Sequence, residues 1–199
     1  GFGYVGFVHA INGNIELDGI LLRGTGLWGE YSYRSTAVDG GRVYADAGAA
    51  SFLVGYQKIL PLFTVRFFAG MDYEGHNLVP YNVYDYNGGT HAGGKGLLQV
   101  ETPWGNEFYG LLHASYSSAR DRYWIRGRAG YNFGEIILGP EAIATGNPVS
   151  YDRGVGGFLT FRSPRWAPFE MTLAAGSSRA PRSRAQSSFY GTLELSTAY

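Results

Sequence analysis

Residues 62–74 read LFTVRFFAGMDYE, and their side chains change character at every second position. The residues of one row are all apolar or aromatic: Phe63, Val65, Phe67, Ala69, Met71 and Tyr73. The other row contains every charge of the stretch, at Arg66, Asp72 and Glu74. Because successive side chains of a β-strand point to opposite faces, this period of two predicts a strand with one apolar and one charged face.

The same sorting recurs further along the chain. In residues 122–133, Arg122, Arg126 and Arg128 share one row, and the opposite row carries no charge. Residues 95–102 and 169–175 are sorted in the same way. With less regular segments added, the sequence predicts eleven strands, at residues 3–11, 19–33, 43–56, 62–74, 95–102, 107–117, 122–133, 135–144, 151–161, 169–175 and 188–199.

Composition narrows the class of protein. The 199 residues contain 16 Lys+Arg and 16 Asp+Glu, and this balance provides no general attraction to nucleic acid. The 16 Tyr, 12 Phe and 31 Gly favour strands and tight turns. There is no cysteine, the four histidines are scattered and no phosphate-binding loop is present, so we expect no disulfide, metal or cofactor. The apolar runs are far shorter than the roughly 18 residues of a membrane-spanning helix.

Two kinds of barrel present such strands, a soluble one with apolar residues inside and a membrane one with apolar residues outside. The charge-free rows favour lipid, because a charge at mid-bilayer costs roughly 2–4 kcal/mol. Aromatic residues gather at strand ends, and the final row ends on an aromatic residue at Tyr199. We therefore predict that lipid contacts the residues Phe63, Phe67, Met71, Tyr123, Ile125, Leu193 and Leu195.

These features predict one domain over residues 1–199, a closed antiparallel transmembrane β-barrel in the outer membrane of a Gram-negative bacterium. Single-chain barrels of this kind normally have an even number of strands, so either one strand precedes Gly1 or one predicted strand is wrongly divided, and we favour about 12 in the complete barrel. Outer loops of such barrels are long, whereas the opposite turns are short. The predicted outer connections are residues 75–90, 117–121, 145–150 and 177–187.

The predicted lumen is rich in charges of both signs. Its lining residues are Arg66, Asp72, Glu74, Lys95, Glu101, Arg126, Arg128, Glu170 and Glu194. Buried charges need partners, so these groups can pair across a narrow interior and plug it. A water-filled pore with a charged, solute-selecting wall is the alternative, and the sequence leaves both open.

Two outer connections carry candidate contact residues. Tyr81, Tyr84 and Tyr86 offer aromatic faces for sugar rings, with an interface belt or loop packing as the alternative. Arg179, Arg182 and Arg184 suit lipopolysaccharide phosphates, with a solvated loop as the alternative. His113 and Ser115 share a strand face, as some outer-membrane phospholipase residues do. They lack an orienting third group within reach, so we do not expect an enzyme.

Several segments resemble a known family. They are GYVGFVHAING at residues 3–13, DGILLR at 18–23, GEYSY at 29–33, LGPE at 138–141 and YDR at 151–153. These segments, in this order and spacing, resemble the cellulose biosynthesis protein BcsS family of alphaproteobacteria. The resemblance implies an outer-membrane barrel encoded among cellulose-synthesis components, and it provides no catalytic residues to carry over.

Two functions follow as expectations. One is an accessory or organising component of cellulose or exopolysaccharide secretion, with lipid, lipopolysaccharide, polysaccharide and secretion components as partners. The other is a small porin-like channel whose charged lumen passes small solutes, saccharides among them. The sequence does not determine the oligomeric state.

Overall fold

A computed structural model describes residues 1–34, 41–80, 88–148, 150–162, 169–179 and 187–197. These residues form eleven strands joined by turns. The strands are β1 (Phe2–Ala10), β2 (Gly19–Arg34), β3 (Arg42–Ile59), β4 (Thr64–Val79), β5 (Gly89–Glu101), β6 (Phe108–Ser117), β7 (Arg122–Asn132), β8 (Ile136–Gly146), β9 (Tyr151–Arg162), β10 (Phe169–Arg179) and β11 (Ser187–Thr197).

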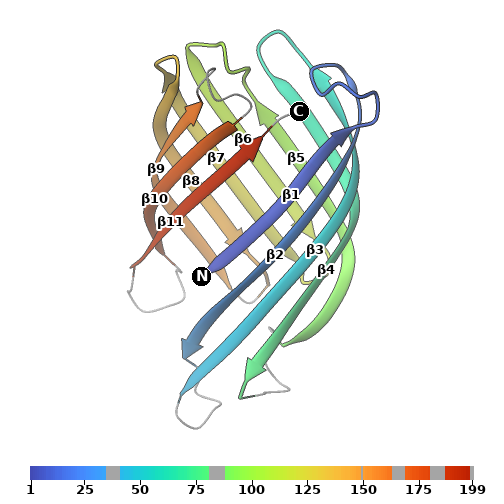
Figure 1. The fold of residues 1–199 in the computed structure, drawn as a ribbon. Helices are drawn as coiled ribbons and strands as arrows, with labels where there is room; N and C mark the ends of the chain where they lie inside the picture. The colour runs from blue at the N-terminus through green and yellow to red at the C-terminus, as the bar shows by residue number, and fades with distance from the viewer. Residues whose placement is uncertain (35–40, 81–87, 149, 163–168, 180–186, 198–199) are drawn as a thin grey trace. The chain divides into compact units, whose positions relative to one another are not determined.

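The strands form one antiparallel sheet in chain order, from β1 to β11 (Figure 1). This confirms the all-β class and the eleven strands predicted from the sequence. The described part of the chain has no helix long and apolar enough to cross a membrane. Several strands are longer than predicted, because β4 continues to Val79 and β5 begins at Gly89, inside the predicted connection 75–90. The added part of β4 is rich in polar residues, so the sequence pattern does not identify it as a strand. In the structure, buried and exposed positions still alternate through it.

The chain divides into two compact units, which we describe separately. Unit 1 contains Gly1–Gln57, Phe67–Gly96 and Ser117–Asp121. Unit 2 contains Lys58–Arg66, Leu97–Tyr116 and Arg122–Tyr199. In each unit we call the sheet face that carries the buried side chains the inner face, and the opposite face the outer face.

In unit 1, β2 lies between β1 and β3, and the β2–β3 register runs from Gly19 opposite Gln57 to Arg34 opposite Arg42. The inner row of β3 is made of small or apolar residues together with two polar ones. Its buried members are Val43, Ala45, Ala47, Ser51, Leu53 and Gln57. The Gln57 amide donates to the main-chain oxygens of Ile15 and Leu17 at 2.6 and 2.7 Å, which anchors the β1–β2 turn.

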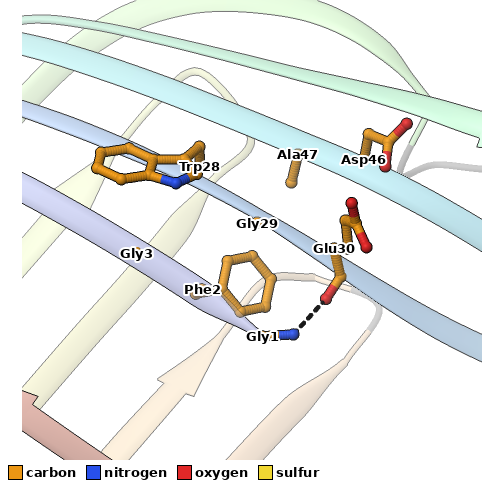
Figure 2. Close-up of a pocket in the computed structure, with 8 residues that line it drawn as sticks. All are labelled: Gly1, Phe2, Gly3, Trp28, Gly29, Glu30, Asp46 and Ala47. Atoms are coloured by element: carbon orange, nitrogen blue, oxygen red, sulfur yellow. Dashed lines mark hydrogen bonds between the residues drawn. The ribbon is translucent and has the colours of Figure 1, made fainter.

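The outer row of β3 is apolar and exposed over a defined length. Between Asp46 and Lys58 it contains Gly48, Ala50, Phe52, Val54 and Tyr56. The outer row of β2 likewise carries no charge from Ile20 to Trp28, and Glu30 then faces Asp46 across the two strands. Figure 2 shows these two carboxylates beside the Trp28 indole. An apolar outer surface therefore ends at a pair of acidic side chains.

In unit 2, β8, β9, β10 and β11 lie side by side (Figure 1), and β7 pairs with β8. Charged and hydroxyl side chains occupy the inner face together with Phe158 and Ile137, both buried. Over the middle of these strands the outer face is apolar. Its exposed members include Ile125, Leu138, Val155, Leu173, Leu193 and Leu195.

Most residues predicted to contact lipid lie on the exposed side of their strands. Phe63, Phe67, Met71, Ile125, Leu193 and Leu195 are exposed, whereas Tyr123 is half-buried. Met71 has 72% of its surface exposed although it lies in the middle of a regular strand. This Met side chain does not pack in the interior. Its exposure on a regular strand indicates that the outer face is suited to an apolar neighbour.

Candidate functional site

The inner face of unit 2 carries a network of two arginines and two glutamates. Arg128 lies between two carboxylates, with its Nε 2.6 Å from Glu141 Oε2 and its Nη2 2.9 Å from Glu194 Oε1. Arg126 contacts the same two residues, with Nη1 2.5 Å from Glu194 Oε1 and Nε 3.4 Å from Glu141 Oε2. Each arginine is therefore shared by both acids, and the four charges sum to zero.

The network joins strands that are far apart in the sheet. Arg126 and Arg128 lie on β7, Glu141 lies on the neighbouring β8, and Glu194 lies on β11. Four strand spacings separate β7 from β11, about 19 Å measured along the sheet. Since Arg128 bonds directly to Glu194, the sheet of unit 2 must curve around these side chains. The network thus fills the concave side of this unit.

Tyr190 extends the network across two further strands. Its hydroxyl donates to Glu141 Oε1 at 3.2 Å, and its ring lies over glycines of β9 and β10. A Cβ added at Gly156 would lie 2.7 Å from the Tyr190 hydroxyl and 2.2 Å from the Ala175 carbonyl oxygen. At Gly176 an added Cβ would lie 2.7 Å from the Tyr190 ring. These glycines allow the ring to lie flat on the sheet and reach β8.

Burial makes this network costly to break. The Glu141 side chain has no exposed surface, and that of Arg128 is only 4% exposed. A buried charge that loses its partner destabilises a protein by about 3–5 kcal/mol. Glu194, with 20% of its side chain exposed, keeps some contact with solvent. Burial and shared contacts thus hold these four side chains in place against one another.

A second charged group in unit 2 lies on β4 and β5. Arg66 pairs with Glu101, and Gln99 Nε2 donates to Glu101 Oε2 at 2.9 Å. Glu170 on β10 is half-buried and lies directly opposite Arg162 on β9. Each of these named groups has an opposite charge or an amide donor close by.

In unit 1 the inner face carries two smaller polar groups. Lys95 Nζ lies 3.1 Å from Asp72 Oδ1. Further along β4, His76 bridges the Tyr31 hydroxyl, 2.9 Å from Nδ1, and Glu74 Oε1, 2.7 Å from Nε2.

The turn before β7 is tied to this second group. Buried Arg120 places its Nε 3.7 Å from Glu74 Oε1 and donates from Nη2 to the Gly89 carbonyl oxygen at 2.8 Å. In the part of the chain that the structure describes, no three His, Asp or Glu side chains are arranged to hold a metal ion.

All nine lumen residues predicted from the sequence lie on inner faces. The structure pairs eight of them, in the Arg126–Arg128–Glu194 network, the Arg66–Glu101 pair, the Lys95–Asp72 pair and the Glu74–His76 pair. Glu170 is the ninth. The structure does not gather them at one point: they belong to the four-residue network of unit 2 and to separate pairs elsewhere.

Sequence reasoning missed the partners that complete these groups. They are Tyr31, His76, Arg120, Glu141 and Tyr190. Glu141 had a usable signal, because it alternates with exposed Pro140 and Ala142 on a strand that the sequence predicted. Nothing local indicates that Tyr190 covers Gly156, since that contact depends on how β9, β10 and β11 are aligned.

The residues predicted to contact sugars or lipopolysaccharide lie mostly outside the described residues. This applies to Tyr81, Tyr84, Tyr86, Arg182 and Arg184. Arg179 is described, and it is an exposed residue at the end of β10. His113, considered above for an enzyme, lies edge-on against the Trp124 ring at 4.8 Å between ring centres.

Comparisons with known proteins identify the family. The sequence model of the family described as cellulose biosynthesis protein BcsS matches residues 1–199, which is the whole chain. No solved structure and no curated protein matches the chain. The protein belongs to the BcsS family of cellulose biosynthesis proteins.

Proposed function

We propose that this chain forms a closed barrel in the outer membrane of a Gram-negative bacterium and serves cellulose secretion as an accessory or organising component that does not itself conduct glucan. The observation that carries this proposal is the buried ion network of unit 2. Glu141 and Arg128 are almost fully removed from solvent and occupy the concave side of the sheet. A lumen filled in this way leaves little room for a polymer.

The outer faces support the membrane location. The charge-free outer row of β3 spans residues 47–57, and that of β10 spans residues 169–178. A strand needs about 9–11 residues to cross the hydrocarbon core of a bilayer. Aromatic residues, Trp28 and Tyr56, lie at opposite ends of this band in unit 1. Lipid would be a favourable neighbour for such a face. Without lipid, the exposed Phe, Leu and Met side chains would be in unfavourable contact with water.

Closure of the barrel belongs to the same proposal. In lipid, every main-chain polar group needs a partner, so an open sheet edge is not tolerated in the hydrocarbon region. The curvature that the Arg128–Glu194 contact requires in unit 2 supports closure. About 12 strands in the complete barrel would satisfy the even number typical of such proteins.

The cellulose role is tested by deleting the gene and measuring cellulose at the cell surface. We expect cellulose to be lost or disorganised in the deletion strain and restored by the wild-type gene. A variant with Tyr81, Tyr84 and Tyr86 changed to alanine tests the predicted polysaccharide contact, with the corresponding phenylalanine variant as the matched control that keeps the rings. Normal cellulose in the deletion strain would refute the cellulose role.

A small porin-like channel is the second candidate, and one observation favours it. The side chains of Lys95, Glu101 and Glu194 keep 20–28% of their surface exposed, so parts of the inner face reach solvent. Conductance across a planar bilayer separates the two candidates. The plugged barrel predicts silence, whereas a channel predicts a stable current whose ion selectivity changes in Arg126→Gln and Arg128→Gln variants.

A further inference from the structure

Two arginines face each other on the outer face of unit 2. Arg153 on β9 and Arg179 on β10 are direct register partners, and both are exposed. Like charges placed directly opposite each other destabilise an antiparallel pair. Among the described residues, neither guanidinium has a carboxylate partner, and the recorded contact of Arg153 is with the Tyr151 ring, 5.5 Å from the ring centre. Within the described residues, no anion neutralises this pair.

The residues beside the pair change in polarity in a regular order. The next register row on the same face consists of Val155, Ser177 and Phe189, and it combines two large apolar side chains with a hydroxyl. Phe189 is 89% exposed and Val155 is 66% exposed. Toward the middle of the strands the next row is Gly157, Ala175 and Gly191, and the row after it is Leu159, Leu173 and Leu193. From the middle of the strands toward this end, the outer face is thus first purely apolar. It then carries one hydroxyl, and finally two guanidinium groups and a tyrosine.

A membrane lipid has the same order of chemistry. Its acyl chains suit the leucine row, its ester region suits Ser177, and a phosphate on its headgroup suits the arginines. Guanidinium groups bind phosphate through paired hydrogen bonds, which lysine cannot do. Tyr151 has the ring and the hydroxyl that are favoured at the boundary between lipid and water.

We propose that Arg153, Arg179 and Tyr151 form a binding site for the phosphate of an outer-leaflet lipid, of the phosphorylated glycolipid class. This inference rests on the membrane location proposed above. The phosphate lies between the two guanidinium groups and removes their repulsion, while the lipid chains cover Val155 and Phe189. The site differs from the loop patch predicted from the sequence, because Arg153 comes from another strand and only Arg179 is common to both.

The test is thermal unfolding in uncharged detergent micelles to which diphosphoryl lipid A is added in steps. We expect the wild-type protein to gain thermal stability with added lipid A. Lipid A without its phosphates, and inorganic phosphate alone, should each have little effect. Changing both arginines to glutamine should weaken the apparent lipid affinity by about tenfold or more, as expected when charge-assisted contacts to phosphate are lost.

Two further variants separate binding from folding. Arg179→Glu places an acid opposite Arg153, so it should match or exceed the wild-type melting temperature without lipid and still lose the response to lipid A. Arg162→Gln is the matched control. Arg162 also lies on β9 and over an aromatic ring, that of Trp104 at 5.3 Å, but it faces Glu170 instead of an arginine. Its response to lipid should stay at the wild-type level.

The outcomes are distinguishable. A wild-type response in the double glutamine variant or in Arg179→Glu overturns the site, and so does an equal response to inorganic phosphate. Cell fractionation tests the membrane location separately, because the arginine variants and the wild type should all appear in the outer-membrane fraction. Wild-type protein found outside that fraction would overturn the proposed function, and this inference with it.

Discussion

The inner faces of the two units are filled in different ways. In unit 1, β3 presents Val43, Ala45 and Leu53, all almost fully buried, on its inner row. In unit 2, the corresponding space holds Arg128 and Glu141, which are just as buried. Both units have an apolar stretch on their outer faces. The charged inner residues of unit 1, among them Asp72 and Glu74, lie on β4 and not on β3.

This difference shows that both apolar and charged side chains can be buried on an inner face. Small apolar residues in unit 1 bring neighbouring elements into contact without requiring partners. In the ion network of unit 2, the loss of Arg128 or Glu141 alone leaves its partner as a buried charge without its closest counter-charge. We expect the two units to respond differently to substitutions.

The largest effect is expected at Arg128. Changing it to methionine leaves the buried Glu141 with the Tyr190 hydroxyl and, as its one cationic neighbour among the described contacts, the more distant Arg126, so the free energy of unfolding in detergent should fall by about 3–5 kcal/mol. Chemical denaturation followed by tryptophan fluorescence measures this. Combining it with Glu141→Leu removes both charges and should recover much of the loss, because Arg126 and Glu194 still pair. A single variant as stable as the wild type would contradict the plug.

In unit 1 the corresponding test is Leu53→Ala. Leu53 is 1% exposed on the inner face, so the substitution leaves a cavity and should cost about 2–5 kcal/mol. Its neighbour Phe52 is exposed on the outer face, and Phe52→Ala should cost far less if lipid or detergent surrounds that face. Equal losses for the two variants in the same unfolding assay would show that the faces are wrongly assigned.

Gly156→Ala tests the cradle under Tyr190. The new methyl group would lie 2.2 Å from a main-chain oxygen and close to the Tyr190 hydroxyl, so a destabilisation of about 1–3 kcal/mol is expected. The adjacent Gly157 is the control, because an added Cβ there meets its nearest neighbour at 3.6 Å. Thermal melting of both variants decides the point. If Gly157→Ala were the more damaging change, the described position of the ring would be wrong.

The smallest effect is expected for a neutral pair on the inner face of unit 2. Thr160 and Thr172 are buried register partners whose hydroxyl oxygens lie 2.8 Å apart. Thr172→Val should cost about 1 kcal/mol, since it leaves the Thr160 hydroxyl without this partner. Changing both threonines to valine should restore most of the loss in the same melting experiment. An additive loss in the double variant would mean that the hydroxyls do not depend on each other.

The strand pattern could be predicted from the sequence because it is local. Alternation in residues 62–74 and 122–133 identifies strands and assigns Arg66, Asp72 and Arg128 to one face without any knowledge of their neighbours. The weakest predictions were the strand ends. β4 continues through His76 to Val79, because the packing of Leu78 with Val43 and Ala45 outweighs the polar appearance of this segment.

By itself the sequence determined that the chain is all-β, how many strands it shows and which row of each carries the charges. Only the tertiary structure decided which charges meet. It placed Glu194 against Arg126 and Arg128, laid Tyr190 over Gly156, and put Arg153 opposite Arg179. The physical reason is register. A period of two orients a side chain toward one face, but its partner across the sheet depends on how segments far apart in the chain align, and no local pattern contains that alignment.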